Sequence, residues 1–280
     1  MEVTLKYQSP GRKVLYEMRR MEEAGLREGK TNNATNTFFS LTYEGQKDGL
    51  DTFTYRVSGH TQTNHSGLYA WVEDLQPLTS YLELGIGKSG RIEKILNGKK
   101  IYNSWDGKIW YATRKKHKRE ENAEAMLENV DGTLRDDELF ANTLRYAPPF
   151  SLLFSGIHGM LFDRDKIQKR TGCLPGFFGE SNLPLLIEDE IKASEKEGES
   201  YEIKSEGKLD EKHFNRDIFR TFVRTLSDSP TAVCDLSTHH TERYLFDSNG
   251  WIRTGMWLHL SVVPYFMLRE ERCFLKARQS

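Results

Sequence analysis

The sequence has few cysteines, almost no excess charge and no hydrophobic run long enough to cross a bilayer. Its three cysteines, Cys173, Cys234 and Cys273, are widely spaced and form no CxxC pair. An odd number of distant cysteines argues against a disulfide framework in a chain of this length, so we expect free thiols. The net charge of −1 lacks the basic excess that is typical of a nucleic-acid-binding protein.

The absence of long apolar segments also bears on location. The most apolar segments, residues 148–162 and 257–268, are shorter than the roughly 20 residues of a transmembrane helix, and each contains a histidine. Residues 1–7 alternate polar and apolar side chains and contain no leader pattern. We therefore expect a soluble cytoplasmic protein without a transmembrane segment, or one whose export signal has been removed. Hydrophobic residues at 37% and aromatic residues at 11% are sufficient for a folded core.

The residue pattern changes along the chain. Residues 1–98 show the two-residue alternation of strands, residues 99–170 show helical spacing, and residues 199–280 contain one helix followed by strand-like runs. Residues 171–200 combine glycines, prolines and a charged run, which predicts a long connection. We therefore predict an α+β fold in a single domain of residues 1–280. An antiparallel sheet of hairpins would lie at both ends of the chain, with the helical middle packed against it.

Two local predictions are the firmest. The apolar residues of segment 214–226 recur at helical spacing and predict a helix. Asp210 is its expected N-cap, and residues 227–230 are expected to end it. Residues 247–250 are turn formers between two strand-like runs, and they predict a β-hairpin.

Two motifs could indicate phosphate or nucleic-acid binding. Residues 85–90 match GxGxxG, but the Walker spacing fails and residues 91–96 are too few for the helix that phosphate binding needs. We interpret this motif as a β-turn. Residues 114–119 are the densest basic run, but glutamates follow at once and no aromatic residue is interleaved for base stacking. We interpret the run as a solvated, ion-paired helix face.

The candidates for metal or catalytic chemistry are weak. One cluster could ligate a metal: His213, Cys234, Asp235, His239 and His240. In an extended strand His239 and His240 point to opposite faces, so they cannot bind one ion together. The carboxylates of residues 188–190 lead into further charges, which favours a surface segment over an acid–base pair. With no GxSxG motif either, we assign no catalytic, cofactor-binding or metal-binding residue.

One segment suggests recognition of a partner. Residues 174–179 place two aromatic residues, Phe177 and Phe178, in what we predict to be a loop. Loops with exposed aromatic residues often bind other proteins. We hypothesise that Phe177 and Phe178 contact a partner protein; the alternative is that both rings attach a long loop to the core.

Two short segments resemble other proteins. Residues 90–97, with Ile101 and Trp105 after them, resemble a pattern in uncharacterised Bacteroidota proteins, in which a hairpin strand runs into a helix that carries a tryptophan. Residues 244–260 are similar to the closing hairpin of those proteins. Such proteins look like accessory components encoded beside contractile secretion or injection systems. The resemblance covers some forty residues and implies no catalytic residue.

Three hypotheses about function follow. The first is a non-enzymatic accessory or adaptor protein that binds another protein and no cofactor, in keeping with the resemblance. The second is a carrier that holds a small apolar ligand in a curved antiparallel sheet. Aromatic residues at strand positions could line its cavity: Phe38, Tyr43, Phe53, Tyr55, Trp251 and Trp257. The third is an enzyme whose active-site residues are dispersed in the sequence.

Overall fold

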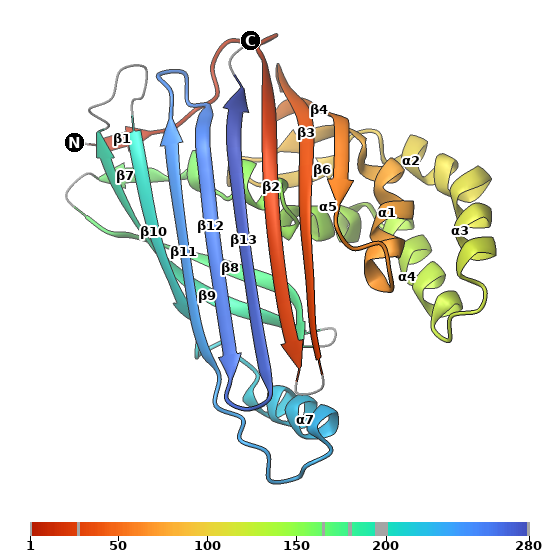
Figure 1. Cartoon of the computed structure of the whole chain (residues 1–280). Helices are drawn as coiled ribbons and strands as arrows, with labels where there is room; N and C mark the ends of the chain where they lie inside the picture. Colours follow the sequence, from red (N-terminus) through yellow and green to blue (C-terminus); the bar gives the residue numbers. More distant parts are fainter. Residues whose placement is uncertain (1, 27–28, 164–165, 179–180, 194–200, 279–280) are drawn as a thin grey trace. The chain divides into compact units, whose positions relative to one another are not determined.

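The computed structural model describes residues 2–26, 29–163, 166–178, 181–193 and 201–278 (Figure 1). Contacts divide the chain into two compact units that alternate along the sequence. The described part of unit 1 comprises residues 2–6, 18–36 and 161–277, and that of unit 2 comprises residues 7–17, 37–160 and 278. Strands β2 (Lys13–Leu26) and β3 (Gly29–Lys47) contribute residues to both units. The prediction of a single domain remains a prediction.

Unit 2 adds three strands and most of the helices to its parts of β2 and β3. The strands are β4 (Leu50–Gln62), β5 (Tyr81–Ile86) and β6 (Ile92–Ile95). The helices are α1 (Leu68–Thr79), α2 (Gly98–Ser104), the π-helix η1 (Trp105–Ile109), α3 (Trp110–His117), α4 (Ala123–Arg135), α5 (Asp137–Tyr146), α6 (Phe150–Leu153) and the 3₁₀ turn η2 (Ile157–Gly159). The helical character expected for residues 99–170 is therefore confirmed as far as residue 159, whereas residues 161–163 and 168–170 belong to strands.

Aromatic residues form the core of unit 2. The ring of Phe53 lies 5.0 Å from that of Tyr43 and 5.2 Å from that of Phe154, measured between centroids. Tyr55 packs edge-on against Phe150 at 5.0 Å. These strand aromatics pack on one another and on α6 and the residue after it, so core packing accounts for them without a ligand.

Helix α1 was not predicted. It has no side-chain N-cap, it contains Pro77, and its first turn has no acidic residue, so the usual sequence signals of a helix are missing.

The turn predicted at residues 85–90 is confirmed: the Gly90 amide donates to the Gly87 carbonyl at 2.9 Å, and strand β6 follows at once. The ion-paired basic run is confirmed as well, since Arg114 contacts Glu124 at 2.9 Å.

Unit 1 is built on a run of antiparallel strands. They are β8 (Gln168–Phe178), β9 (Ser181–Ala193), β10 (Tyr201–Leu209), β11 (Ser237–Phe246), β12 (Ile252–Val263) and β13 (Met267–Arg278). Helix α7 (Arg216–Ser227) connects β10 to β11, and β1 (Glu2–Thr4) pairs with β7 (Leu161–Asp163). The hairpin predicted around residues 247–250 is confirmed by the pairing of Phe246 with Ile252.

The order of strands confirms the predicted α+β fold class with an antiparallel sheet. Hydrogen bonds join eleven strands in the order β6-β5-β4-β3-β2-β13-β12-β11-β10-β9-β8. Most neighbours in this order are also neighbours in the sequence, as in a meander of hairpins. No helix among the described residues is long and apolar enough to span a bilayer.

The long connection expected at residues 171–200 is wrong for the described part of that segment, which forms the β8–β9 hairpin. Pro184 is tolerated in β9 because it lies beyond the ladder with β10, which ends at Leu185 opposite Leu209. A Cβ atom at Gly172 in β8 would lie 2.6 Å from Cδ1 of Ile187, so the end of that side chain would have to move. Proline and glycine therefore lie within strands here, and not in a loop.

Helix α7 begins later than predicted. Its N-cap is Asn215, whose side chain accepts a hydrogen bond from the Ile218 amide at 3.0 Å. The expected cap, Asp210, instead accepts from His213 at 2.7 Å. The predicted end is confirmed, because Asp228 at φ 48° closes the helix in the left-handed conformation.

The strands of unit 1 curl into a concave surface. Three strand spacings of about 4.8 Å separate β8 from β11, yet the Arg170 guanidinium on β8 reaches the Glu242 carboxylate on β11. Farther along β8, the ring of Phe177 lies 6.0 Å from the ring of His259 on β12. Strands that would be far apart in a flat sheet therefore face each other across its concave side. We call this concave side the inner face of unit 1, and the opposite side its outer face.

Candidate functional site

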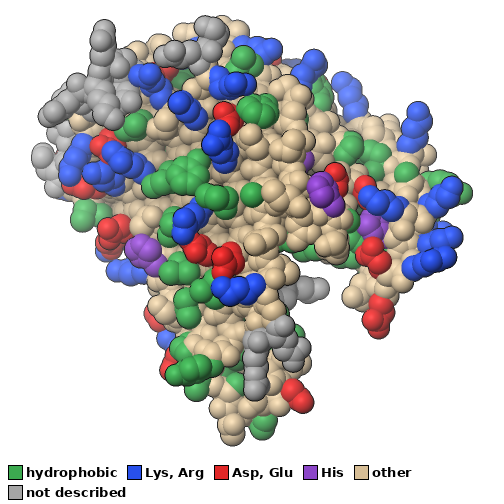
Figure 2. Space-filling model, viewed as in Figure 1, with side chains coloured by type: hydrophobic (Ala, Val, Ile, Leu, Met, Phe, Trp, Pro, Cys, Tyr) green, Lys and Arg blue, Asp and Glu red, His purple; other side chains and the backbone are tan. Residues whose placement is uncertain are grey.

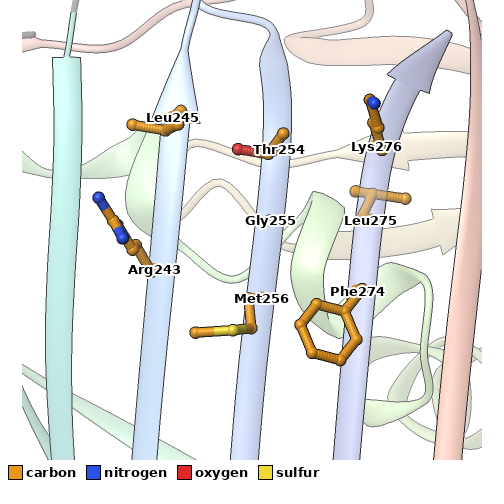
Figure 3. A pocket seen from close by; sticks show the side chains of 8 residues that line it. All are labelled: Arg243, Leu245, Thr254, Gly255, Met256, Phe274, Leu275 and Lys276. Atoms are coloured by element: carbon orange, nitrogen blue, oxygen red, sulfur yellow. The ribbon is translucent and has the colours of Figure 1, made fainter.

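The outer face of unit 1 carries a shallow groove over β11, β12 and β13 (Figure 3). Its volume is about 350 Å³, and its lining includes the apolar side chains of Leu245, Met256 and Phe274. Arg243 extends from β11 toward β10, where it pairs with Glu202 at 2.5 Å. In the space-filling view, hydrophobic side chains on this face are interspersed with charged ones (Figure 2).

The inner face of the same strands carries polar side chains in two adjacent rows. In the first row, Asp189, Ser205, Glu242 and Trp257 are directly opposite one another on β9, β10, β11 and β12. The second row holds the following residues of β10, β11 and β12: Gly207, His240 and His259. We call these side chains, with Arg170 of β8, the inner polar cluster: Arg170, Asp189, Ser205, His240, Glu242, Trp257 and His259.

Glu242 is the centre of the hydrogen bonds in this cluster. Its carboxylate accepts from the Arg170 guanidinium, from His240 Nε2 at 2.9 Å and from the Tyr244 hydroxyl at 2.8 Å. Burial raises the pKa of Glu242, but Arg170 and the hydrogen bonds from His240 and Tyr244 outweigh it and hold the pKa well below its ordinary value. Glu242 is therefore ionised at neutral pH.

Asp189 is the second acid of the cluster, and the structure contradicts the prediction that it lies on a charged surface. It is 0% exposed, and one of its oxygens accepts from Arg170 Nε at 2.9 Å. Burial raises the pKa of Asp189, although the charge of Arg170 opposes that effect. Its neighbours Glu188 and Glu190 point to the outer face, where they pair with lysines as expected.

Three buried side-chain atoms of the cluster have no hydrogen-bond partner: His240 Nδ1, Trp257 Nε1 and His259 Nδ1. Ser205, directly opposite Asp189, hydrogen-bonds to its carboxylate. A buried polar atom without a partner costs about 1–3 kcal/mol, and native proteins contain few of them. Three of them lie close together, in two adjacent rows of one sheet face. They identify the inner polar cluster as the candidate functional site of unit 1.

His259 and Ser261 resemble part of a hydrolytic triad, but the third member is missing. His259 Nε2 lies 2.6 Å from the Ser261 hydroxyl. No carboxylate of the described residues binds the other ring nitrogen, which is without a partner. Burial, and then the charge of His240, lower the pKa of His259 to about 3. A neutral imidazole without an orienting acid is not set up as the general base of such a triad.

Gly207 makes room for His240. A Cβ atom at Gly207 would lie 2.9 Å from His240 Cδ2 and 3.1 Å from its Cβ. We expect Gly207→Ala to displace the imidazole and to lower the free energy of unfolding by about 1–3 kcal/mol, measured by urea denaturation. Gly255→Ala is the matched control, because its new Cβ atom would have only ordinary contacts at 3.6 Å. Equal effects of both substitutions would contradict this prediction.

A further buried histidine, His117, lies in unit 2, and both of its ring nitrogens have partners. His117 is 2% exposed and contacts Asp74 at 2.7 Å and Glu120 at 2.6 Å through its two ring nitrogens. Trp71 stacks on the imidazole at 4.1 Å and donates its indole N–H to Glu120 at 2.7 Å. This cluster therefore ties α1 to α3, which is a structural role.

The residues that the sequence suggested as parts of a functional site do not come together in the structure. Phe177 lies in strand β8, not in a loop, and is 4% exposed within the apolar cluster under α7, so its ring is not available to a partner. The side chain of Phe178 lies outside the described residues, and its partner contact stays a prediction. His239 is exposed and His240 is buried, so their expected opposite orientation is confirmed. The described residues contain no group of three or more ligands that could hold a metal.

The fold and the inner polar cluster define an α+β protein with a curled antiparallel sheet. No protein-family model matches the sequence, and no curated protein matches it. A structure described as showing lipid–protein interactions in lipovitellin is similar, with a TM-score of 0.48 and 10% identity over 98% of this chain. This chain spans about a quarter of that lipovitellin chain, 26% of its length.

A second solved structure is a domain described as an outer membrane lipoprotein-sorting protein from Vibrio parahaemolyticus. Its TM-score is 0.15 and its identity 9%, over 94% of this chain and 86% of that domain. Neither likeness is close enough to indicate what this chain binds.

Proposed function

We propose that the protein is a carrier of a small amphipathic molecule, which binds inside the curled sheet of unit 1. The observation that carries this proposal is the set of three unpartnered polar atoms in the inner polar cluster: His240 Nδ1, Trp257 Nε1 and His259 Nδ1. A bound molecule with hydrogen-bonding groups would satisfy them. It would thereby offset the cost of burying them.

The burial of charged side chains in the inner polar cluster favours a role in binding a ligand over a role in stabilising the fold. Buried ion pairs such as Arg170–Asp189 rarely stabilise a fold more than apolar side chains of similar volume would. Groups of buried titratable residues are instead typical of binding and catalytic sites. The cluster is therefore more readily explained by a ligand than by the stability of the sheet.

Apolar residues lie next to the polar rows. Under α7, Leu183, Leu185 and Val263 of the strands pack against Phe219 and Val223 of the helix, and all five are buried. Phe177 connects the two regions, since it belongs to this apolar group and its ring contacts His259. A ligand whose polar group binds at the inner polar cluster would have its hydrocarbon part next to these apolar residues.

Native mass spectrometry of the full chain, purified without a tag from the organism that encodes it, tests the proposal. We expect an added mass on the order of a few hundred daltons. Trp257→Phe keeps most of the ring but removes the unpartnered N–H, and we expect it to lower the occupancy about fivefold. Leu258→Met, next to it on the outer face, is the control. Bare chain alone, before and after incubation with an extract of host lipids, would contradict the proposal.

The outer groove supports a second candidate function, the binding of another protein. Every outer position of β12 from Met256 to Val262 is apolar, and Phe274 beside it is 41% exposed. A solvated sheet face normally carries polar side chains. An added protein mass in the same spectra would favour this candidate and the accessory-protein hypothesis. Association with a secretion or injection system and the enzyme hypothesis remain predictions from the sequence.

A further inference from the structure

Helix α3 and the end of the π-helix before it carry a high density of positive charge. Residues 108–119 contain six lysines and arginines and no aspartate or glutamate. Two of the six form an ion pair, Arg114 with Glu124 at 2.9 Å and Lys116 with Asp74 at 2.8 Å. The other four are exposed and have no acidic partner among the described residues: Lys108, Lys115, Lys118 and Arg119. Their charge is available to an anionic partner.

An exposed aromatic residue lies on the same side of the helix as these cations. Tyr111, Lys115 and Lys118 are separated by four and three residues, so their side chains are neighbours on the helix surface. The tyrosine is 68% exposed. In the space-filling view, Lys and Arg side chains gather on the right-hand edge, over α3 (Figure 2). We call the following residues the basic face of α3: Lys108, Tyr111, Lys115, Lys116, Lys118 and Arg119.

The basic face of α3 includes a small pocket beside the π-helix η1. Its volume is about 270 Å³, and these residues line it: Asp74, Lys108, Ile109, Ala112, Thr113 and Lys116. The carboxylate of Asp74 is already bound by Lys116 at 2.8 Å and by His117 at 2.7 Å. Single-turn π-helices are frequent at functional sites. The ammonium group of Lys108 can therefore bind an anion in this pocket without breaking an existing ion pair.

The charge of the chain and the aromatic residues of α3 favour a membrane over a nucleic acid as the partner. A nucleic-acid-binding domain is normally basic as a whole, whereas this chain has a net charge of −1. Single strands stack on several aromatic rings, but Arg114 lies over the ring of Trp110 at 5.2 Å, which leaves Tyr111 alone on α3. Clusters of four to eight lysines and arginines on a helix, with tyrosine at the headgroup level, are typical of binding to anionic lipids.

We propose that the basic face of α3 binds the anionic surface of a lipid bilayer. Phosphate groups of lipid headgroups pair with the four cations that have no acidic partner, and one phosphate enters the pocket beside η1. The ring of Tyr111 lies at the depth of the headgroups. The proposal concerns unit 2 and goes beyond the carrier function, because it holds whether or not unit 1 binds a ligand.

Co-sedimentation of the full chain with lipid vesicles tests the proposal. Vesicles of phosphatidylglycerol and phosphatidylcholine in equal parts are compared with vesicles of phosphatidylcholine alone, at an ionic strength of about 0.1 M. We expect the anionic vesicles to bind the chain at least about tenfold more tightly, because each exposed cation near an anionic membrane contributes about fivefold. Equal binding to both kinds of vesicle, or binding to neither, overturns the proposal. Tighter binding to a DNA duplex than to the anionic vesicles overturns it as well.

Paired lysine variants then locate the contact. Lys115→Gln together with Lys118→Gln should weaken binding to the anionic vesicles about twentyfold. Lys204→Gln together with Lys208→Gln is the matched control, because both lysines are exposed on the outer face of β10 and their loss changes the net charge equally. Equal weakening in the two double variants means that net charge alone attracts the membrane, and the assignment to α3 is then wrong.

Tyrosine variants separate contact with the headgroups from attraction at a distance. Tyr111→Ser leaves every charge in place, and we expect it to weaken binding to the anionic vesicles about threefold, because the ring no longer reaches the headgroups. Tyr265→Ser is the control, since Tyr265 is 97% exposed in the turn between β12 and β13 of unit 1. If Tyr111→Ser binds the vesicles as tightly as Tyr265→Ser, the basic face of α3 does not lie against the bilayer.

Discussion

Arg170→Met is expected to lower the free energy of unfolding by about 3–5 kcal/mol. Arg170 is the only cation that contacts both Asp189 and Glu242 among the described residues, and both acids are buried. Its removal takes away the guanidinium that both buried carboxylates share, and methionine fills only part of the volume. Urea denaturation followed by circular dichroism measures the change.

Two further variants separate the lost charge from the lost volume. Lys169→Met changes the neighbouring outer residue, whose exposed pair with Glu188 at 3.3 Å should contribute less than about 1 kcal/mol. The triple variant Arg170→Met, Asp189→Asn, Glu242→Gln removes all three charges together. We expect it to recover most of the stability that the single variant loses, because no buried charge is left unpaired. A triple variant as unstable as the single one would show that packing, not charge, is the function of Arg170.

Local patterns predicted some elements well. Segment 214–226 has apolar residues at a strict helical spacing, and the turn at 247–250 has residues that suit a hairpin, so both could be found without tertiary information. Helix α1 has neither a cap nor an acidic first turn, and packing determines it, as shown by Trp71 stacked on His117. Residues with weak local preferences take the structure that their distant contacts favour.

The inner polar cluster could not be assembled from the sequence because its contacts are distant. Arg170 and Glu242 are 72 residues apart, and they meet only because the sheet curls, a property that no local pattern encodes. Asp189 was taken for a surface residue since its neighbours are charged; the strand alternation that buries it was hidden by Glu188 and Glu190. One signal was present: polar residues at every second position, as in His240 and Glu242, within strands that are otherwise apolar inside.

Acidification from pH 7 to pH 5 is expected to lower the stability of unit 1, with about 2 kcal/mol of the loss due to His259. Burial, and then the charges of His240 and Arg269, lower the pKa of His259 from 6.5 to about 3. Between these two values the unfolded chain binds a proton that the folded chain does not. The stabilisation from neutral His259 is therefore fully present above pH 6.5 and is lost progressively as the pH falls toward 3.

His259→Gln isolates this contribution because glutamine is polar and does not titrate. Its free energy of unfolding, from urea denaturation at both pH values, should fall by about 2 kcal/mol less than that of the unchanged chain. His239→Gln is the matched control, since His239 is exposed on the opposite face of β11 and should keep the full pH dependence. If His259→Gln and His239→Gln lose the same stability between pH 7 and pH 5, His259 is protonated without penalty in the folded chain. The inner polar cluster would then be open to water, and its unpartnered atoms would need no ligand to satisfy them.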